Sequence, residues 1–296
     1  MKQVAILLSP RLLSFRNKGF AKDRSIKFIL FAGIGLSFWA GIFAICYRVL
    51  MYFQRVEGLG NILASKLLSM VLLVFFSLLI FSSILTSLSN LYLSRDLAFV
   101  HSLPVPSEKI FLAKWIESTI DSSWMVVVYT IPVFISYGIV FNAGPFFYAD
   151  IALTLFPLCI IASALSSILV LATVIILPAS RIRSIFVFLG LALLVILYMT
   201  FRLLRPERLV NPENFASLLS YLNDLSAPSS PLLPSTWAFD SLKAALAGDV
   251  GHALFNTSLS ISCAGFLIFL SILIARAVYF KGVFQITSIN GPVFSS

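Results

Sequence analysis

Six stretches of this chain contain no Asp, Glu, Lys or Arg, and each has about the length that a helix needs to cross a lipid bilayer. They are Phe28–Tyr47, Leu67–Ser94, Ser122–Ala149, Ile151–Ser180, Ser184–Phe201 and Ala253–Ala275. A hydrocarbon core about 30 Å thick requires roughly 20 helical residues. The pattern therefore predicts an all-α polytopic membrane protein whose six transmembrane helices cover about residues 28–49, 67–90, 110–141, 151–178, 184–203 and 253–277.

The charge distribution predicts the orientation of these spans. With 59% hydrophobic and 11% charged residues, the chain has too few charges for a soluble surface. The excess of Lys and Arg (21 against 12 acidic residues) would suggest a nucleic-acid partner in a soluble protein. Here fourteen of the 21 fall on one side of the membrane if the N-terminus is cytoplasmic. The positive-inside rule then places both termini in the cytoplasm, and we expect no nucleic-acid partner.

Residues 1–27 mix apolar clusters with basic side chains, among them Arg11, Arg16 and Lys18. This is typical of an amphipathic helix that lies on an anionic membrane surface, although a disordered basic tail is the alternative. The first apolar run is too short, and lacks the small-residue cleavage site, for a signal peptide. At the other end, residues 282–296 are expected to form a short cytoplasmic tail.

The segment Leu91–Ser102, between the second and third spans, has the pattern of an amphipathic helix. Leu91, Leu93 and Phe99 share an apolar face, whereas Ser94 and His101 belong to the polar face. Pro104 and Pro106 forbid its continuation. A membrane-surface helix that merely joins two spans is the alternative to a docking element.

After the prolines, Ser107 is predicted to cap a helix that continues into the third span. Lys114, Glu117 and Asp121 recur on it at spacings of three and four and therefore share a face. They form either a salt-bridged stripe or, for Glu117 and Asp121, the polar entrance of a translocation path.

The loop 204–252, predicted on the outer side, contains two short helical patterns separated by a proline-rich break. The first covers residues 213–224, and the second runs from Trp237 to Ala247, with Ser235 or Thr236 as its cap and Gly248 as its end. Trp237 suits a membrane interface.

Sequence signatures of catalysis and metal binding are missing from the chain. The two histidines, His101 and His252, are predicted on opposite sides of the membrane, and no HExxH or GxSxG motif occurs. The three cysteines lie in different spans and are interpreted as core residues. No GxxxxGK[ST] phosphate-binding loop is present. We therefore expect no enzyme activity, cofactor or metal in this chain, and we expect energy to come from a partner.

The six windows also contain no ionisable residue, which argues against coupling to protons or sodium. Hydroxyl groups remain as polar groups inside the spans.

Residues 90–106, followed by Lys109 and Lys114, resemble the pattern that follows the second span in ABC type-2 exporter permeases. The runs Leu204–Phe215 and Leu233–Leu242 are similar to the outer loop of bacterial members. The resemblance implies a permease of the bacterial inner membrane that dimerises, or pairs with a second permease half. It also implies a separate ATPase subunit that binds ATP and Mg²⁺. Some members are nearly twice as long, and whether this chain is a half-length form or a truncated copy stays open.

The resemblance further implies roles for particular residues. Residues 91–102 would be the coupling helix, residues 1–27 the interfacial elbow helix, and the loop helices a shield on the exit side. The residues expected to contact the ATPase are Ser94, Arg95, Asp96, Phe99 and His101.

Two other functions stay open. One is a partner-independent transporter or flippase that uses the hydroxyl groups of Ser82, Ser83, Thr86, Ser163, Ser166 and Ser167, although such groups more often pack helices. The other is a membrane scaffold subunit without transport activity. Apolar spans suit the export of lipid, drug, peptide or polysaccharide equally, so the substrate stays open as well.

Overall fold

The computed structural model describes residues 25–55, 60–94, 104–176 and 230–287, together with the five positions Gly190, Leu191, Val195, Tyr198 and Met199. In this part of the chain the regular elements are all helices. They are α2 (Ser25–Gln54), α3 (Gly60–Leu88), the π-helical turn η3 (Ser89–Leu93), α5 (Ser107–Val140), α6 (Pro145–Ile176), α9 (Pro234–Leu246) and α10 (Val250–Thr287).

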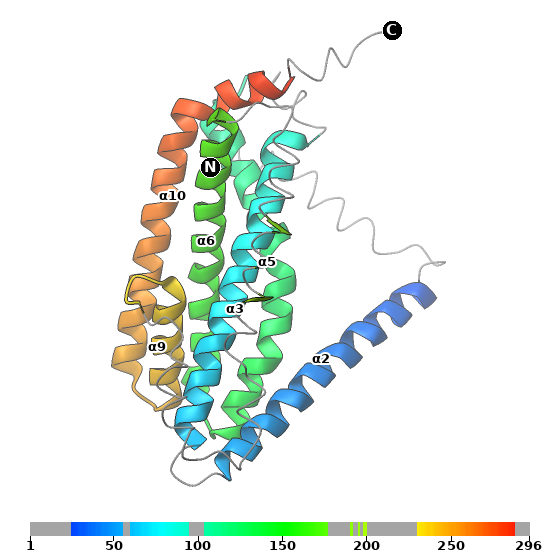
Figure 1. The fold of residues 1–296 in the computed structure, drawn as a ribbon, viewed down its shortest axis with the longest axis vertical. Coiled ribbons are helices and arrows are strands. Elements are labelled where there is room, and N and C mark those ends of the chain that lie inside the picture. The colour runs from blue at the N-terminus through cyan, green and yellow to red at the C-terminus, as the bar shows by residue number, and fades with distance from the viewer. Residues whose placement is uncertain are drawn as a thin grey trace.

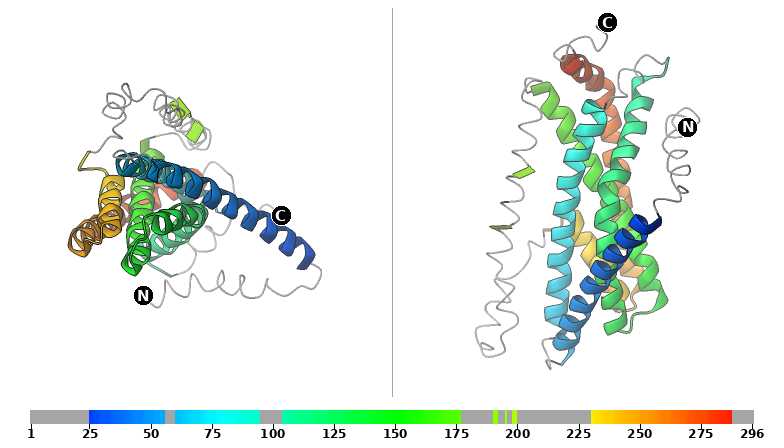
Figure 2. Two further views of the ribbon diagram at one scale, coloured as in Figure 1. Left: turned by 90° about the horizontal axis from the view of Figure 1, so that it is seen from below. Right: turned by 90° about the vertical axis from the view of Figure 1, so that its right-hand side faces the viewer.

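Four long helices, α3, α5, α6 and α10, run side by side along the long axis of the molecule (Figure 1). The short α9 packs beside α6 and α10 at one end of this bundle. The oblique α2 meets the bundle at the same end and diverges from it, as both views in Figure 2 show. We call this the α9 end, and we call the opposite end, where α5 begins, the Pro104 end.

Among the described residues, five helices are long and apolar enough to cross a membrane. Their candidate spans are Gly33–Gln54, Gly60–Leu93, Glu108–Val140, Pro145–Val174 and Val250–Ala277. The all-α prediction is confirmed for the described residues. The predicted span 184–203 lies outside them except for the five isolated positions. Among these, Gly190 is buried, and a Cβ atom there would lie 2.6 Å from the Phe81 ring of α3.

Several helices begin or end beyond the predicted boundaries. α3 begins at Gly60 rather than near residue 67, and α6 begins at Pro145 rather than at Ile151. α10 continues beyond its candidate span into the predicted tail, to Thr287. The predicted windows stopped at charged residues, whereas a helix continues through such a residue wherever its side chain finds water or a partner. The predicted end of the third span was correct: α5 ends at Val140 with Phe141 as its C-cap.

The junction between α2 and α3 brings two backbones into close contact. A Cβ atom on Gly60 would collide with the backbone carbonyl of Phe53, so only glycine fits at the start of α3.

Two side-chain bonds attach α2 to α5, and both go to backbone carbonyls that α5 cannot satisfy itself. Pro132 lies inside α5 and has no N–H to offer the carbonyl of Val128, four residues earlier. The indole nitrogen of Trp39 on α2 donates to this carbonyl at 3.2 Å. The side-chain amide of Gln54 donates to the carbonyl of Val140, in the last turn of α5, at 2.6 Å.

Because Trp39 compensates for the proline, its contribution should depend on residue 132. We expect Trp39→Phe to lower the stability of the protein by about 1 kcal/mol, the typical net value of one hydrogen bond. In a Pro132→Ala background the restored N–H can satisfy Val128, and the same substitution should cost clearly less. Thermal unfolding of the four proteins in detergent forms a double-mutant cycle that measures this coupling. Equal costs in both backgrounds would contradict the proposed compensation.

Candidate functional site

The predicted docking helix does not begin at Leu91. α3 ends at Leu88 and passes into η3, and Ser94 then leaves the helix in an extended conformation, with φ −66° and ψ 133°. A continuous helix over 91–102 is therefore wrong at its N-terminal end, because residues 91–93 form the last turn of the second membrane helix. Arg95, Asp96, Phe99 and His101 lie outside the described residues.

The residues just before and just after the segment 95–103 pack into an aromatic cluster. Leu91 and Tyr92 from η3, Phe111 and Trp115 from α5, and Tyr279 from α10 are all buried. The ring centroid of Tyr279 lies 5.7 Å from those of Tyr92 and Phe111. Its hydroxyl donates to the carbonyl of Leu91 at 3.3 Å. The segment 95–103 thus connects to the bundle through a packed apolar base.

The start of α5 is defined by Pro106, whose extended backbone makes it the N-cap, and not by Ser107 as predicted. The carbonyl of Pro106 accepts the first helical bonds, from the N–H groups of Lys109 at 3.0 Å and Ile110 at 3.3 Å. Glu108 in the first turn pairs with Arg276 of α10 at 3.0 Å, and both side chains are exposed. This ion pair links α5 to α10 beside the aromatic base.

Hydroxyl groups interlock α3, α5 and α6 toward the Pro104 end. The side chains of Ser83 and Ser122 lie 3.0 Å apart, as do those of Ser87 and Ser118. Toward α6, Thr119 contacts Ser163 at 2.6 Å. The hydroxyl groups suggested for a partner-independent transport path all bond to other side chains or to backbone carbonyls: Ser82, Ser83, Thr86, Ser163, Ser166 and Ser167. Their observed role is helix packing.

The acidic pair proposed as a path entrance lies in the same region. Glu117 pairs with Lys114 at 3.1 Å, and Asp121 accepts a 3.2 Å bond from the amide of Asn90 on α3. These contacts favour the interpretation as a polar stripe, and the bond between Asn90 and Asp121 holds α5 against α3.

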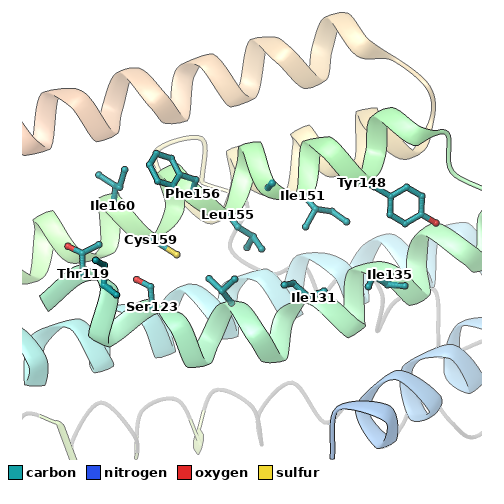
Figure 3. A pocket seen from close by; sticks show the side chains of 13 residues that line it. Thr119, Ser123, Ile131, Ile135, Tyr148, Ile151, Leu155, Phe156, Cys159 and Ile160 are labelled. Carbon is teal, nitrogen blue, oxygen red and sulfur yellow. The ribbon is translucent and has the colours of Figure 1, made fainter. Parts of the chain in front are cut away.

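An apolar groove of about 540 Å³ runs between α5 and α6. Figure 3 shows Ile131 and Ile135 on α5 facing Ile151 and Leu155 on α6, with the hydroxyl groups of Thr119 and Ser123 toward one end. Glu117 and Asp121 do not line this groove. A Cβ atom on Gly138 would lie 2.7 Å from the Tyr148 hydroxyl, so the glycine makes room for the tyrosine at the other end.

At the α9 end, the second predicted loop helix is present with shifted bounds. α9 begins at Pro234, which suits the first turn of a helix because its missing N–H would have no partner there. Gly248, the predicted end, has a positive φ of 81° just beyond the helix. Trp237 is half-buried on α9 and donates to the carbonyl of Pro231 at 2.7 Å. His252 pairs with Asp249 at 2.7 Å on the exposed surface.

The remaining predictions concern residues outside the described part of the chain. These are the loop helix at 213–224 and the interfacial residues Arg11, Arg16 and Lys18.

One polar cluster, centred on Asp150, is not among the sites predicted from the sequence. Asp150 falls between the predicted spans 110–141 and 151–178, but α6 begins at Pro145 and therefore carries Asp150 inside a membrane-length helix, where it is fully buried. Its carboxylate contacts Ser241 of α9 and Thr257 of α10. The Gly144-Pro145 pair was the available signal, since proline favours the first position of a helix.

Taken together, the described part is an all-helical protein with five helices able to cross a membrane, and within it no group of three or more His, Cys, Asp or Glu residues could hold a metal ion. A family model described as "Putative ATP-binding cassette" matches residues 20–295. The chain therefore belongs to this ATP-binding cassette (ABC) family. No curated protein and no solved structure matches the chain.

If the role of Asp121 is to hold α5 against α3, its removal should lower the stability of the protein. We expect Asp121→Ala to cost about 1–2 kcal/mol, because the partly buried amide of Asn90 loses its acceptor. Glu108→Ala on the same helix should change stability by no more than about 0.5 kcal/mol, since its ion pair is exposed. Thermal unfolding in detergent compares the two variants. An Asp121→Ala protein with unchanged stability and altered transport would instead favour the path entrance.

Proposed function

We propose that this chain is the transmembrane permease subunit of an ABC type-2 exporter. In this proposal it moves a substrate outward across the bacterial inner membrane, and a separate nucleotide-binding subunit supplies ATP hydrolysis. The observation that carries the proposal is the match of an ABC family model to a chain that has membrane-length helices and no phosphate-binding loop. ATP and Mg²⁺ would then bind to the partner, and this chain would itself be no enzyme.

The proposed ATPase contact is the segment 95–103, which we place on the cytoplasmic side. Arg95 and Asp96 offer opposite charges for ion pairs, while Phe99 and His101 offer ring contacts. Both flanks of the segment are fixed. Leu91 and Tyr92 are buried against Tyr279, and Pro104 and Pro106 precede a helix that is tied to α10 through Glu108 and Arg276. A push on the segment would therefore reach α3, α5 and α10 together.

Complete transport would require a second permease unit, either another copy of this chain or a related half. Type-2 permeases function as pairs, and we extend this arrangement to the present chain through the resemblance alone. The N-terminal residues 1–27 would lie along the inner membrane surface, and α9 would cover the exit side.

A partner-independent transporter or flippase receives less support. It would need polar groups that face a path, whereas the hydroxyl groups suggested for it bond within the bundle. Transport by the isolated chain in liposomes without ATP would favour it. Unimpaired export after deletion of this subunit, with its partners still assembled, would favour the scaffold function.

The docking proposal predicts a specific loss of coupling. Replacing Arg95 and Asp96 together with Ala should weaken ATPase binding at least about tenfold, because removing charged groups from an interface typically costs about 2 kcal/mol or more. Stimulation of ATP hydrolysis in reconstituted complexes should fall with it. The measurement is ATP turnover as a function of ATPase concentration in proteoliposomes.

A matched control removes one basic and one acidic side chain at the opposite end, Lys243→Ala with Asp249→Ala, both of which are exposed. This variant should keep normal stimulation, although it loses the bond from the His252 N–H to Asp249 at the start of α10 and is therefore expected to be about 1 kcal/mol less stable. The Arg95/Asp96 variant should keep the unfolding temperature of the parent protein. Normal stimulation by the Arg95/Asp96 variant would overturn the docking role. The retention of an ATPase during purification from membranes tests the wider proposal.

A further inference from the structure

A buried carboxyl group joins three helices at the α9 end of the bundle. Asp150 of α6, Ser241 of α9 and Thr257 of α10 are almost wholly inaccessible to solvent, with exposed fractions of 0%, 0% and 3%. α9 is only 13 residues long, and Ser241 lies near its middle, on the side that faces the bundle. The cluster therefore lies where the short helix meets α6 and α10, which lie beside it in Figure 1.

The Ser241 hydroxyl lies within hydrogen-bonding distance of four oxygen atoms. Its Oγ is 3.0 Å from Oδ2 and 3.2 Å from Oδ1 of Asp150. It is also 3.0 Å from the backbone carbonyl of Ala253 and 2.8 Å from the hydroxyl of Thr257. The Thr257 hydroxyl in turn lies 3.2 Å from Oδ1 of Asp150. Five oxygen atoms from three helices thus meet in direct contact.

These contacts require more hydrogen atoms than an ionised Asp150 allows. Ser241 and Thr257 have one hydroxyl hydrogen each, and neither a carboxylate nor a carbonyl can donate. If Ser241 donates to Asp150, its 3.0 Å contact with the Ala253 carbonyl contains no hydrogen. A proton on Oδ2 of Asp150 supplies a third hydrogen and relieves this conflict. The acid then donates to Ser241, Ser241 donates to Ala253, and Thr257 donates to Oδ1, so that among these pairs of groups only the hydroxyl groups of Ser241 and Thr257 share no hydrogen.

The charge balance leads to the same assignment. Within the described residues, Asp150 has no ion pair, and its hydrogen-bond partners are hydroxyl groups. A buried carboxylate without a positive partner costs several kcal/mol, which a proton removes.

We propose that Asp150 is a proton-binding site whose proton holds α9 against α6 and α10. When the acid releases its proton to solvent, the electron pair of the O–H bond stays on the carboxylate. Ser241 must then turn its hydrogen from Ala253 to Asp150. The bond between α9 and α10 is lost, and an uncompensated charge remains at the junction. This inference goes beyond the export function, because it concerns how the short helix is held.

Other titratable groups lie on the elements around the cluster, and none of them bonds to Asp150. On α9, partial burial raises the pKa of Asp240, and Lys243 opposes this shift. At the start of α10, hydrogen bonds from His252 lower the pKa of the exposed Asp249. Lys66 lies on α3, and the described part of α6 has no charged side chain besides Asp150.

The test compares the parent protein with Asp150→Asn in detergent from about pH 5 to about pH 9, the range in which buried carboxyl groups titrate. Asparagine reproduces the protonated acid, since its amide donates to Ser241 and its carbonyl accepts from Thr257, but it cannot ionise. Hydrogen exchange of the α9 amides, expressed as the ratio of parent to variant, cancels the intrinsic pH dependence of exchange. We expect a ratio near one at low pH that rises several-fold at high pH.

Asp240→Asn on the same helix is the matched control, and its α9 exchange should follow the parent protein at every pH. Infrared difference spectra give a readout that does not require the Asp150 variant to fold. The parent protein should have a protonated-carboxyl C=O band that disappears at high pH and shifts in Ser241→Ala. A ratio that stays at one, or the absence of such a band at any pH, would overturn the proposal. So would protection of α9 that follows sodium concentration when choline replaces sodium, because a metal cation would then be the ligand.

Discussion

The fold depends on one constraint, which is that polar groups between apolar helices are costly unless they find partners inside the protein; among the described residues, the Tyr92 hydroxyl and the Trp115 indole nitrogen are exceptions. Water cannot serve them in a hydrocarbon environment, so each unsatisfied group is costly. Pro132 is the clearest example, because it has no N–H to donate to the carbonyl of Val128. The structure supplies the missing donor from Trp39 on a different helix. Gln54 does the same for Val140 at the end of α5. The side chains of Trp39 and Gln54 thus attach α2 to α5 because they donate to carbonyl groups that α5 leaves unpaired.

The same constraint explains why the two ends of the bundle differ. At the Pro104 end, the aromatic rings around Tyr279 pack tightly, and charges such as Glu108 and Arg276 remain at the surface. Such an end would give firm support to the proposed ATPase contact at residues 95–103. At the α9 end, the carboxyl group of Asp150 is enclosed, and its partners come from helices far apart in sequence. An enclosed polar cluster holds elements together in one arrangement and is sensitive to its own protonation.

The sequence was most informative where apolar runs were long. The helical class and the positions of the described membrane helices followed from charge-free windows, because a bilayer tolerates few charges. The same rule produced the main errors. It placed the start of the second span after Lys66, although α3 begins at Gly60, and it excluded Asp150 from α6. A window cannot distinguish a solvated charge from a buried side chain with partners. The break at Ser94 was also missed, because amphipathic periodicity continues past it. The pairing of Asn90 with Asp121 depends on the register of two helices, which one sequence does not specify.

A single helix connects the two ends. α10 contributes Thr257 to the Asp150 cluster and Tyr279 to the aromatic base, and no break occurs between them. The 22 residues that separate the two positions correspond to about 33 Å of helix, close to the thickness of a hydrocarbon core of about 30 Å. If Tyr279 lies at one boundary of the apolar layer, the buried acid lies near the other boundary and not at the centre. This position agrees with a carboxyl group that can exchange its proton with solvent. It also means that a displacement of the aromatic base along α10 would act directly on the contact between Thr257, Ser241 and Asp150. The tilt of one rigid helix is thus the simplest physical connection between the proposed ATPase contact and the helix α9 at the opposite end.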